Sequence, residues 1–73
     1  MQKVTRLGEK LRKLRREREL TLVALARRLN MSSHSYFSDL ENGKKNPSLS
    51  LIVTLANFFE VTTDQLLRDD LDV

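Results

Sequence analysis

Apolar residues recur along this chain at the three- and four-residue spacing of amphipathic helices, and the alternating pattern of a strand is absent. Leu7, Leu11 and Leu14 form the first apolar stripe, which predicts a helix from about Val4 to Arg18. The outer faces of this helix are expected to carry its basic residues Arg6, Lys10, Arg12, Lys13, Arg15 and Arg16. The chain therefore begins with a basic helix whose apolar stripe is narrow.

A second helix is predicted after Thr21, whose hydroxyl suits the N-cap position. The inner face of this helix is supplied by Ala24, Leu25, Ala26 and Leu29. Asn30 tolerates the left-handed conformation that ends many helices, and Met31 is expected to fill the turn that follows.

The third helix is predicted to span residues 34–41, with Ser33 as its N-cap and Phe37 and Leu40 on its inner face. Asn42 and the glycine after it should stop this helix. A cap at Ser32 would rotate the helix by about 100° and expose Phe37, so the register with Ser33 is favoured.

Two further helices follow a polar loop and Pro47. Ser48 should cap the fourth, whose apolar stripe is Ile52, Leu55, Ala56 and Phe59. Thr62 and Gln65 have the spacing of a capping box and predict a short fifth helix. The acidic tail, residues 69–73, is expected to fray. The predicted fold is a compact all-α domain of five helices over residues 1–73, with its core in residues 4–68.

Composition excludes several classes of protein. The chain has 73 residues and no cysteine, so disulfides and thiolate metal sites are excluded, and one histidine alone cannot form a metal site. No apolar run approaches the ~20 residues of a membrane span, and the N-terminus lacks the apolar core of a signal peptide. We expect a cytoplasmic location, no cofactor and no metal. No nucleophile–base pair or phosphate loop indicates an enzyme, and nothing indicates a small-molecule effector.

Charge is distributed unevenly along the chain. Residues 1–30 carry ten Lys and Arg against three Glu, a balance of +7, whereas residues 31–73 carry three against seven acids, a balance of −4. A basic half suits a polyanion, because Lys and Arg placed on phosphates release condensed counterions. The alternative is that these long side chains simply solvate helix faces.

The segment from Thr21 to Gly43 has the properties of two helices that cross and present one of them to a DNA groove. Such an arrangement needs small residues where the helices cross, an apolar residue in the turn and polar side chains on the second helix. Ala24 and Ala26 meet the first need and Met31 the second. The polar outer face would be made by His34, Ser35, Tyr36, Ser38 and Asp39.

From Leu7 to Leu67 the chain resembles the Cro/phage-repressor (Xre-type) helix-turn-helix family. The matching stretches, whose order and spacing are specific together, are LGEKLRKLRRERELT, Leu25-Ala26, YFSDLENGKKNPS and LIVTLANFFEVTTDQLL. The resemblance implies a lambda-repressor-like five-helix fold, no enzymatic activity, double-stranded DNA as partner and binding as a homodimer to a two-fold operator. It also implies a prokaryotic cytoplasmic protein that lies on the nucleoid when bound.

Site residues follow from the resemblance by position. Contacts with base edges would fall on His34, Ser35, Tyr36 and Asp39. Contacts with phosphates would fall on Ser33, Ser38, Asn42, Lys44 and Lys45. The family's ion pair between the first and recognition helices would join Arg15 and Glu41, unless Arg15 merely extends over the surface.

Three features depart from the family pattern. Leu22 replaces the polar residue that usually holds a phosphate, and it is expected to cover the edge of the core instead. The span from Leu25 to Glu41 is one residue longer than usual, and we place the extra residue in the turn at 30–32. The recognition face lacks Arg, Lys, Gln and Asn, so direct base recognition should be modest, about 1 kcal/mol per contact.

Several residues keep two interpretations. His34 either contacts DNA or is a solvated residue of the first helical turn, and Tyr36 either contacts a base or packs on the rim of the core. Phe58 is either half-buried against the fifth helix or part of a dimer surface with Leu67 and Leu71.

A sequence-specific transcriptional regulator is the leading hypothesis. It would repress by obstructing a promoter, which is placed first, or activate by contacting polymerase. The alternative is a protein-interaction module that keeps the fold but binds DNA weakly or without specificity. A membrane-surface helix at residues 3–18 ranks third, because its three leucines are needed for the core.

Overall fold

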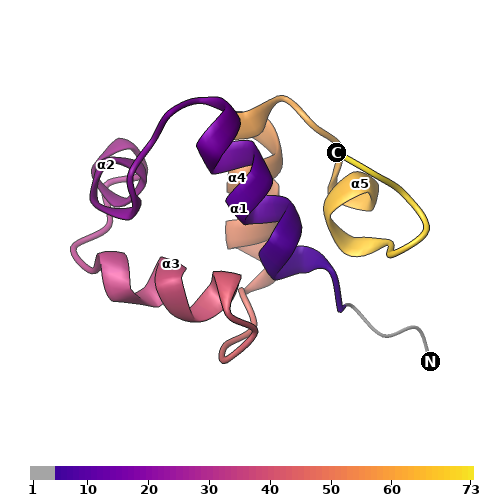
Figure 1. The fold of residues 1–73 in the computed structure, drawn as a ribbon, viewed down its shortest axis with the longest axis horizontal. Helices are drawn as coiled ribbons and strands as arrows, with labels where there is room; N and C mark the ends of the chain where they lie inside the picture. The colour runs from indigo at the N-terminus through magenta and orange to yellow at the C-terminus, as the bar shows by residue number, and fades with distance from the viewer. Residues whose placement is uncertain (1–4) are drawn as a thin grey trace.

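The computed structural model describes residues 5–73, which form five α-helices and no strand (Figure 1). The helices are α1 (Leu7–Glu17), α2 (Leu22–Arg28), α3 (His34–Glu41), α4 (Leu49–Phe59) and α5 (Thr63–Leu67). The predicted all-α, five-helix architecture is confirmed. The first helix is shorter than expected at both ends, and Val4 lies outside the described residues.

The helices are arranged around α1 and α4, which lie in the middle of the molecule. Figure 1 shows α2 and α3 at one end of the long axis and α5 at the other. Contacts join α2 to α3, α1 to α3, and α5 to both α1 and α4. The buried core consists of Leu7, Leu11, Leu14, Leu25, Ala26, Phe37, Leu40, Ile52, Leu55, Ala56, Phe59 and Leu66. All of the inward residues predicted for the third and fourth helices are among them.

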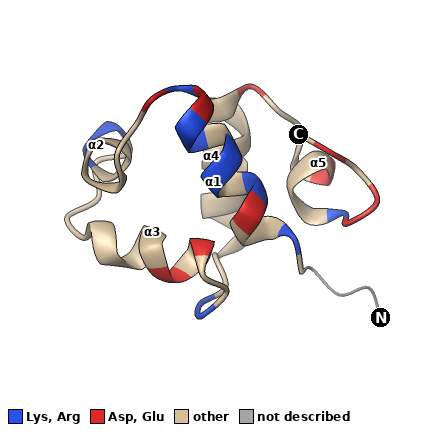
Figure 2. Cartoon of the chain, viewed as in Figure 1, with Lys and Arg blue, Asp and Glu red and all other residues tan. Residues whose placement is uncertain are grey.

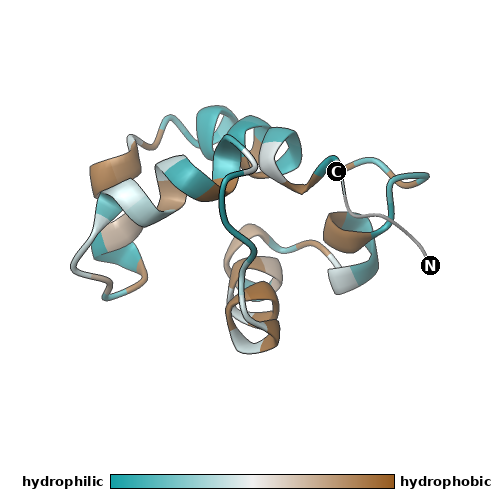
Figure 3. Ribbon diagram, turned by 90° about the horizontal axis from the view of Figure 1, so that it is seen from below, coloured by the Kyte–Doolittle hydropathy of each residue, from teal (hydrophilic) through white to brown (hydrophobic). Residues whose placement is uncertain are grey.

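Surface character differs between the two central helices. Lys and Arg follow one another along α1 (Figure 2), whereas α4 contains no charged residue at all. In Figure 3 the same contrast appears as a largely hydrophilic α1 at the top and a mostly hydrophobic α4 at the bottom. No helix within residues 5–73 combines the length and the apolar character needed to span a membrane.

The predicted caps begin most of the helices. The Thr21 hydroxyl accepts from the Ala24 N–H at 3.0 Å, and the Ser48 hydroxyl accepts from the Leu51 N–H at 3.2 Å. At α5 the capping box is complete, with reciprocal hydrogen bonds of 3.0 and 2.8 Å between Thr62 and Gln65. These bonds satisfy backbone donors that have no partner inside a helix.

The C-terminal tail does not fray, so that expectation is wrong. The Asp69 carboxylate accepts hydrogen bonds from the backbone N–H groups of Thr5 and Arg6, both at 3.1 Å, and from the Thr5 hydroxyl at 2.6 Å. Arg6 in turn donates to the Asp69 carbonyl at 2.6 Å and to the Asp72 carboxylate at 2.7 Å. Among the described residues α1 has no side-chain cap of its own. An acid 63 residues away takes the place of that cap.

Lys10 is also placed differently from the expected outer face of α1, because it is only 2% exposed. Its ammonium donates to the carbonyls of Gln65 and Arg68, both at 2.6 Å. The last carbonyls of a helix lack intrahelical partners and carry its negative partial charge. The end of α5 therefore supplies the partners that a buried ammonium requires, and the aliphatic stem of Lys10 fills space beside the core.

Helices α1 and α3 cross closely where α3 ends. The predicted ion pair is confirmed: Arg15 Nε lies 2.7 Å from one oxygen of Glu41, and Arg15 Nη2 lies 3.0 Å from the other. Arg12 Nε adds a third contact at 3.3 Å, and the Glu41 side chain is 3% exposed. Hydrogen bonding to Glu41 raises the pKa of Arg15, so the guanidinium remains charged.

Gly8 allows the two helices to approach. A β-carbon at this position would lie 2.9 Å from the Leu40 carbonyl oxygen and would also strike the Glu41 carbonyl. Backbone atoms cannot move aside as a flexible side chain could. The absence of a side chain at Gly8 is therefore a condition for the distance between α1 and α3.

Gly8→Ala should reveal this constraint through the sign of its effect. Helix propensity alone predicts a gain of about 1 kcal/mol, because alanine is the better helix former. The clash with α3 should instead lower the free energy of unfolding by about 1–3 kcal/mol. Urea unfolding measures the difference, and a stability equal to or above that of the native chain would contradict the close approach.

The docked tail should make stability depend on acid pH. Hydrogen bonds from Thr5 lower the pKa of Asp69 below its ordinary value of 3.8, and those from Arg6 lower the pKa of Asp72. A carboxyl with a depressed folded-state pKa stabilises the fold above pH 3.8, and this contribution disappears as pH falls through the folded-state pKa.

Asp69→Asn should therefore unfold at a lower temperature than the native chain at neutral pH, with the difference vanishing in strong acid. Thermal unfolding followed by circular dichroism over a pH series measures this convergence. Asp64→Asn, at an exposed position on α5, is the matched control and should show little difference. A gap between Asp69→Asn and the native chain that stayed constant with pH would rule out the proposed role of the carboxylate.

Candidate nucleic-acid interface

The turn between α2 and α3 is built as the sequence predicted. Asn30 has φ 57°, the left-handed conformation expected at this position. Its N–H donates to the Arg27 carbonyl at 3.1 Å, and the Met31 N–H donates to the Ala26 carbonyl at 2.8 Å. Met31 packs against the core, so its role in filling the turn is confirmed. These bonds fix the direction in which α3 leaves the turn.

The register of α3 is also confirmed. Ser33 is the N-cap residue, and Phe37, Leu40 and Glu41 are buried. The Ser33 hydroxyl, however, lies 2.8 Å from the Ser35 hydroxyl, and it makes no cap hydrogen bond with the described backbone. The opposite side of the helix remains accessible. We call His34, Ser35, Ser38, Asp39 and Asn42 the α3 outer face.

His34 and Ser35 are the most accessible of the residues expected to contact bases. Both are exposed in the first turn of α3. Either oxygen of the Ser33–Ser35 hydroxyl pair can act as the donor, so one hydroxyl hydrogen remains available to an outside acceptor. These two residues offer an imidazole and a hydroxyl to a ligand in front of α3.

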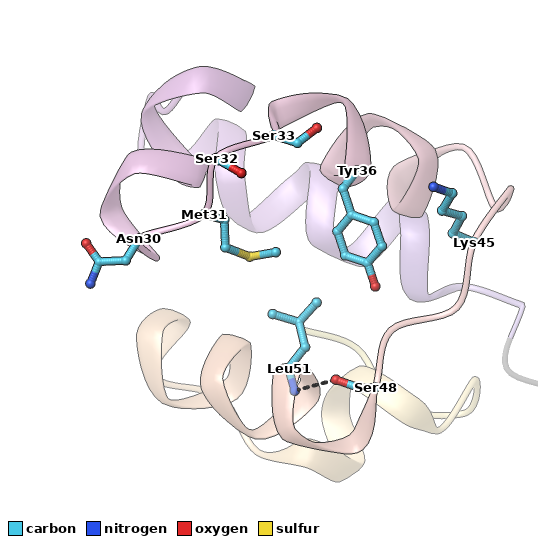
Figure 4. Close-up of a pocket in the computed structure, with 8 residues that line it drawn as sticks. All are labelled: Asn30, Met31, Ser32, Ser33, Tyr36, Lys45, Ser48 and Leu51. Carbon is cyan, nitrogen blue, oxygen red and sulfur yellow. Dashed lines mark hydrogen bonds between the residues drawn. The ribbon is translucent and has the colours of Figure 1, made fainter.

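Tyr36 lies to the side of the α3 outer face. Its ring is half-buried, meets Phe37 edge to face at a centroid distance of 6.0 Å and packs against the core. Figure 4 shows it pointing from α3 toward Leu51 of α4, where it lines an open groove of about 610 Å³. Packing on the core rim is thus confirmed, and a base contact by Tyr36 stays a prediction.

Asp39 is the one acidic residue on the α3 outer face, and a lysine accompanies it. The Lys45 ammonium lies 3.8 Å from the Asp39 carboxylate and 5.6 Å from the centroid of the Tyr36 ring. Because both charges remain in contact with water, this pair contributes little to stability. Its effect is on the surface potential, since Lys45 offsets the repulsion that Asp39 would exert on a phosphate.

At the other end of α3, an arginine orients a candidate phosphate ligand. Arg12 Nη2 donates to the Asn42 carboxamide oxygen at 3.0 Å, which leaves the amide N–H₂ of Asn42 as the outward donor. Sequence reasoning placed Arg12 only on an outer face of α1. Its spacing of three residues from Arg15 was the available signal, because residues at i and i+3 share a helix face.

The remaining phosphate candidates surround this end of the helix. Lys44 is exposed and forms no ion pair with any of residues 5–73, and Ser38 is half-buried. Figure 2 shows basic residues on the loop after α3 and on α1, whereas α3 itself contains neither Lys nor Arg. Positive charge therefore lies beside α3, whose own two acidic residues are paired with cations from α1 and from the loop that follows α3. Within residues 5–73 no three side chains of metal-binding type come together.

Leu22 begins α2 and packs against the core, so the expectation that it covers the core edge is confirmed. The Thr21 hydroxyl is occupied by its cap bond. The start of α2 therefore offers a phosphate its backbone N–H groups, with no polar side chain on Leu22 or on the exposed Val23.

Comparisons with known proteins agree with this geometry. A family model described as a helix-turn-helix domain matches residues 6–70. The chain is 44% identical over 63 residues to a protein named HTH-type transcriptional regulator DdrOP3, from Deinococcus deserti, covering 86% of this chain and 48% of that protein. It is 33% identical over 64 residues to the immunity repressor protein of Bacillus phage phi105, covering 88% of this chain and 44% of the repressor.

A third relative is similar in length as well. The chain is 34% identical over 65 residues to control protein C.MunI from a Mycoplasma species, covering 88% of this chain and 86% of that protein. By contrast, it spans about half the length of the Deinococcus and phage proteins. The family match covers the cap, the turn, the recognition helix and the Arg15–Glu41 pair together. The chain belongs to the helix-turn-helix family of DNA-binding transcriptional regulators, of the Xre type.

Proposed function

We propose that this chain represses transcription by binding a two-fold operator as a homodimer, with α3 of each copy in the major groove. The observation that carries the proposal is the contrast between the two sides of α3. Phe37, Leu40 and Glu41 fix its inner side to the core and to α1, while the α3 outer face is left open. A recognition helix must be held in this way, because its side chains have to meet base edges at a defined depth.

Repression by obstruction is the mode that suits the described residues. The helices are all engaged in the core that holds α3, and the phage relative is named a repressor. A protein that covers a promoter needs only affinity and correct placement. The three named relatives support a role in prokaryotic gene control, where this chain would lie on the nucleoid when bound.

Recognition would divide between two groups of residues. Asn42, Lys44 and the backbone at the start of α2 would hold phosphates and set the position of the domain. His34 and Ser35 would meet base edges, each supplying about 1 kcal/mol of discrimination, at the low end of the usual range. A larger part of the specificity would then come from the shape and deformability of the site.

The interaction-module alternative is favoured by one observation, the Asp39 carboxylate on a face that has no Arg or Lys. Lys45 weakens this argument, since its ammonium lies 3.8 Å from that carboxylate. Selection of sites from a random duplex library separates the two functions. A palindromic preferred site supports the operator-binding function, and equal affinity for selected and random duplexes supports the module.

Lys44→Ala and Ser35→Ala should affect DNA binding in different ways. Removing Lys44 should weaken binding about equally on all sequences and lower the slope of log affinity against log salt by about one unit, because one phosphate contact is lost. Removing the Ser35 hydroxyl should leave the salt slope unchanged and alter preference at particular base pairs. Titrations on the selected site and on two single-base variants, at several salt concentrations, measure both effects.

Arg68→Ala is the matched control for charge removal. It deletes a positive charge that is paired with Asp70 at 2.8 Å, at the α5 end of the molecule, away from α3 (Figure 1). Its salt slope should equal that of the native chain. If Lys44→Ala changed base preference as Ser35→Ala does, or if Arg68→Ala reduced the slope equally, the division of roles would be wrong.

A further inference from the structure

The exposed side of α4 is unlike the rest of the surface. Five exposed residues lie along it with the spacing of one helix face, and we call them the α4 outer face: Leu49, Ser50, Val53, Thr54 and Asn57. None of them is charged, although charged residues make up 32% of the chain. An exposed helix face normally carries charges that keep it in water, so this composition requires an explanation.

Two large apolar side chains on this face are in contact with solvent. Leu49 is 75% exposed and Val53 is 44% exposed, and they stand four residues apart, one above the other. Across residues 5–73 only Val23, on α2, is comparable, at 42%. Part of the hydrophobic character of α4 in Figure 3 therefore belongs to side chains that are exposed to solvent.

The two hydroxyls of the α4 outer face, on Ser50 and Thr54, already have partners within the chain. The Thr54 hydroxyl donates to the Ser50 carbonyl at 3.0 Å, and the Ser50 hydroxyl lies 3.2 Å from that of Ser48. Burying a hydroxyl is costly when it loses its partner, and these two would keep theirs. The face could be covered by another protein surface without leaving these hydroxyls unpaired.

We propose that the α4 outer face is the contact between two copies of this chain, with the two α4 helices packed antiparallel across a two-fold axis. An isologous contact brings the same patch against itself, so any excess of one charge would repel its own copy. A neutral patch on a chain of net charge +3 avoids this repulsion. The small side chains of Ser50 and Thr54 also allow the helix axes to approach to the usual 8–10 Å.

Other occupants fit this face less well. A nucleic acid or an anionic membrane would require Lys or Arg, and a strongly charged protein partner would require complementary charges. The dimer surface expected from the sequence, Phe58 with Leu67 and Leu71, is less available, because two of its side chains already have contacts within the chain. Phe58 is half-buried, packs edge to face on Phe59 and lies 5.5 Å below the Arg18 guanidinium, at the end of α1. Leu67 lines a small groove with Leu7, Pro47 and Ile52.

The contact should be weak without DNA. An 11-residue helix is about 16 Å long, so this interface lies at the low end of sizes for specific complexes. This step rests on the proposed function. Two copies bound to adjacent half-sites would be held close together, and the resulting high effective concentration would allow the weak contact to form. The domain measures 33 × 23 × 20 Å, which is compatible with recognition helices about 34 Å apart on one side of a duplex.

A charge-swap experiment tests the contact on DNA-free protein. Two variants are compared, Leu49→Glu with Val53→Glu, and Leu49→Lys with Val53→Lys. By sedimentation equilibrium at up to ~1 mM, the native chain should dimerise, and each variant alone should dimerise at least roughly a hundredfold more weakly, because like charges meet. An equal mixture of the two variants should form dimers again. Circular dichroism confirms that each variant is folded.

Val23→Glu is the matched control, since Val23 has almost the same exposure as Val53 but lies on α2. It should dimerise like the native chain. The proposal is overturned by a native chain that remains monomeric at ~1 mM, by charge variants that still dimerise, by a mixture that does not, or by an equal loss in Val23→Glu.

A second measurement detects a short-lived contact. The chain has no cysteine, so Val53→Cys introduces a single thiol, and oxidation should yield a covalent dimer faster than oxidation of Val23→Cys. Equal rates would contradict the proposal. Binding to a duplex with one half-site gives the separate result for DNA recognition: the preference among base pairs should be unchanged in the Leu49/Val53 variants, whatever their added charges do to the overall affinity. Loss of all sequence preference there, with dimerisation intact, would reject the operator function and leave the α4 contact standing.

Discussion

The buried carboxylate of Glu41 holds the recognition helix in place. Arg15 contacts both of its oxygens and Arg12 contacts one, so two arginines of α1 bind the Glu41 side chain in the last turn of α3. Gly8 lets the backbone of the same turn come against α1. Breaking such a pair by removing one partner costs more than its formation contributes, because a charge would be left buried alone. The orientation of α3, and with it everything the outer face can reach, depends on this junction.

The same junction links fold and recognition through Arg12. Its guanidinium contacts Glu41 on one side and the Asn42 carboxamide on the other. Asn42 is the first residue beyond α3, where a DNA backbone would pass if α3 lay in the major groove. The group that fixes the helix therefore also fixes a donor at its end. A recognition face with few strong base ligands gains more from such rigidity than from additional side chains.

Local signals made the helix-turn-helix predictable. The caps at Thr21, Ser48 and Thr62, the left-handed Asn30 and the register of Phe37 depend on neighbours within a few residues, which a single sequence displays. The Arg15–Glu41 pair was accessible only through family resemblance. Lys10 and Asp69 were missed, because their partners lie 55 to 64 residues away and, apart from the Thr5 hydroxyl, are backbone groups, which no side-chain pattern reveals. For the candidate site, the sequence predicted which residues lie on the exposed side of α3. It did not decide the direction of the Tyr36 side chain, which lines a groove together with Leu51 of α4.

The cap that Asp69 provides to α1 has a consequence for how the domain is made. A ribosome releases Thr5 and Arg6 long before Asp69. The hydrogen bonds that cap α1 therefore cannot form until nearly the whole domain has been synthesised. The hydrogen bonds of the Lys10 ammonium likewise cannot form before the end of α5 has been made. Contacts between residues this far apart in the sequence form slowly during folding, because the intervening chain must first be closed into a loop. The domain should consequently reach its native state as one late, cooperative event, and a chain interrupted within α5 would leave its first helix without a cap.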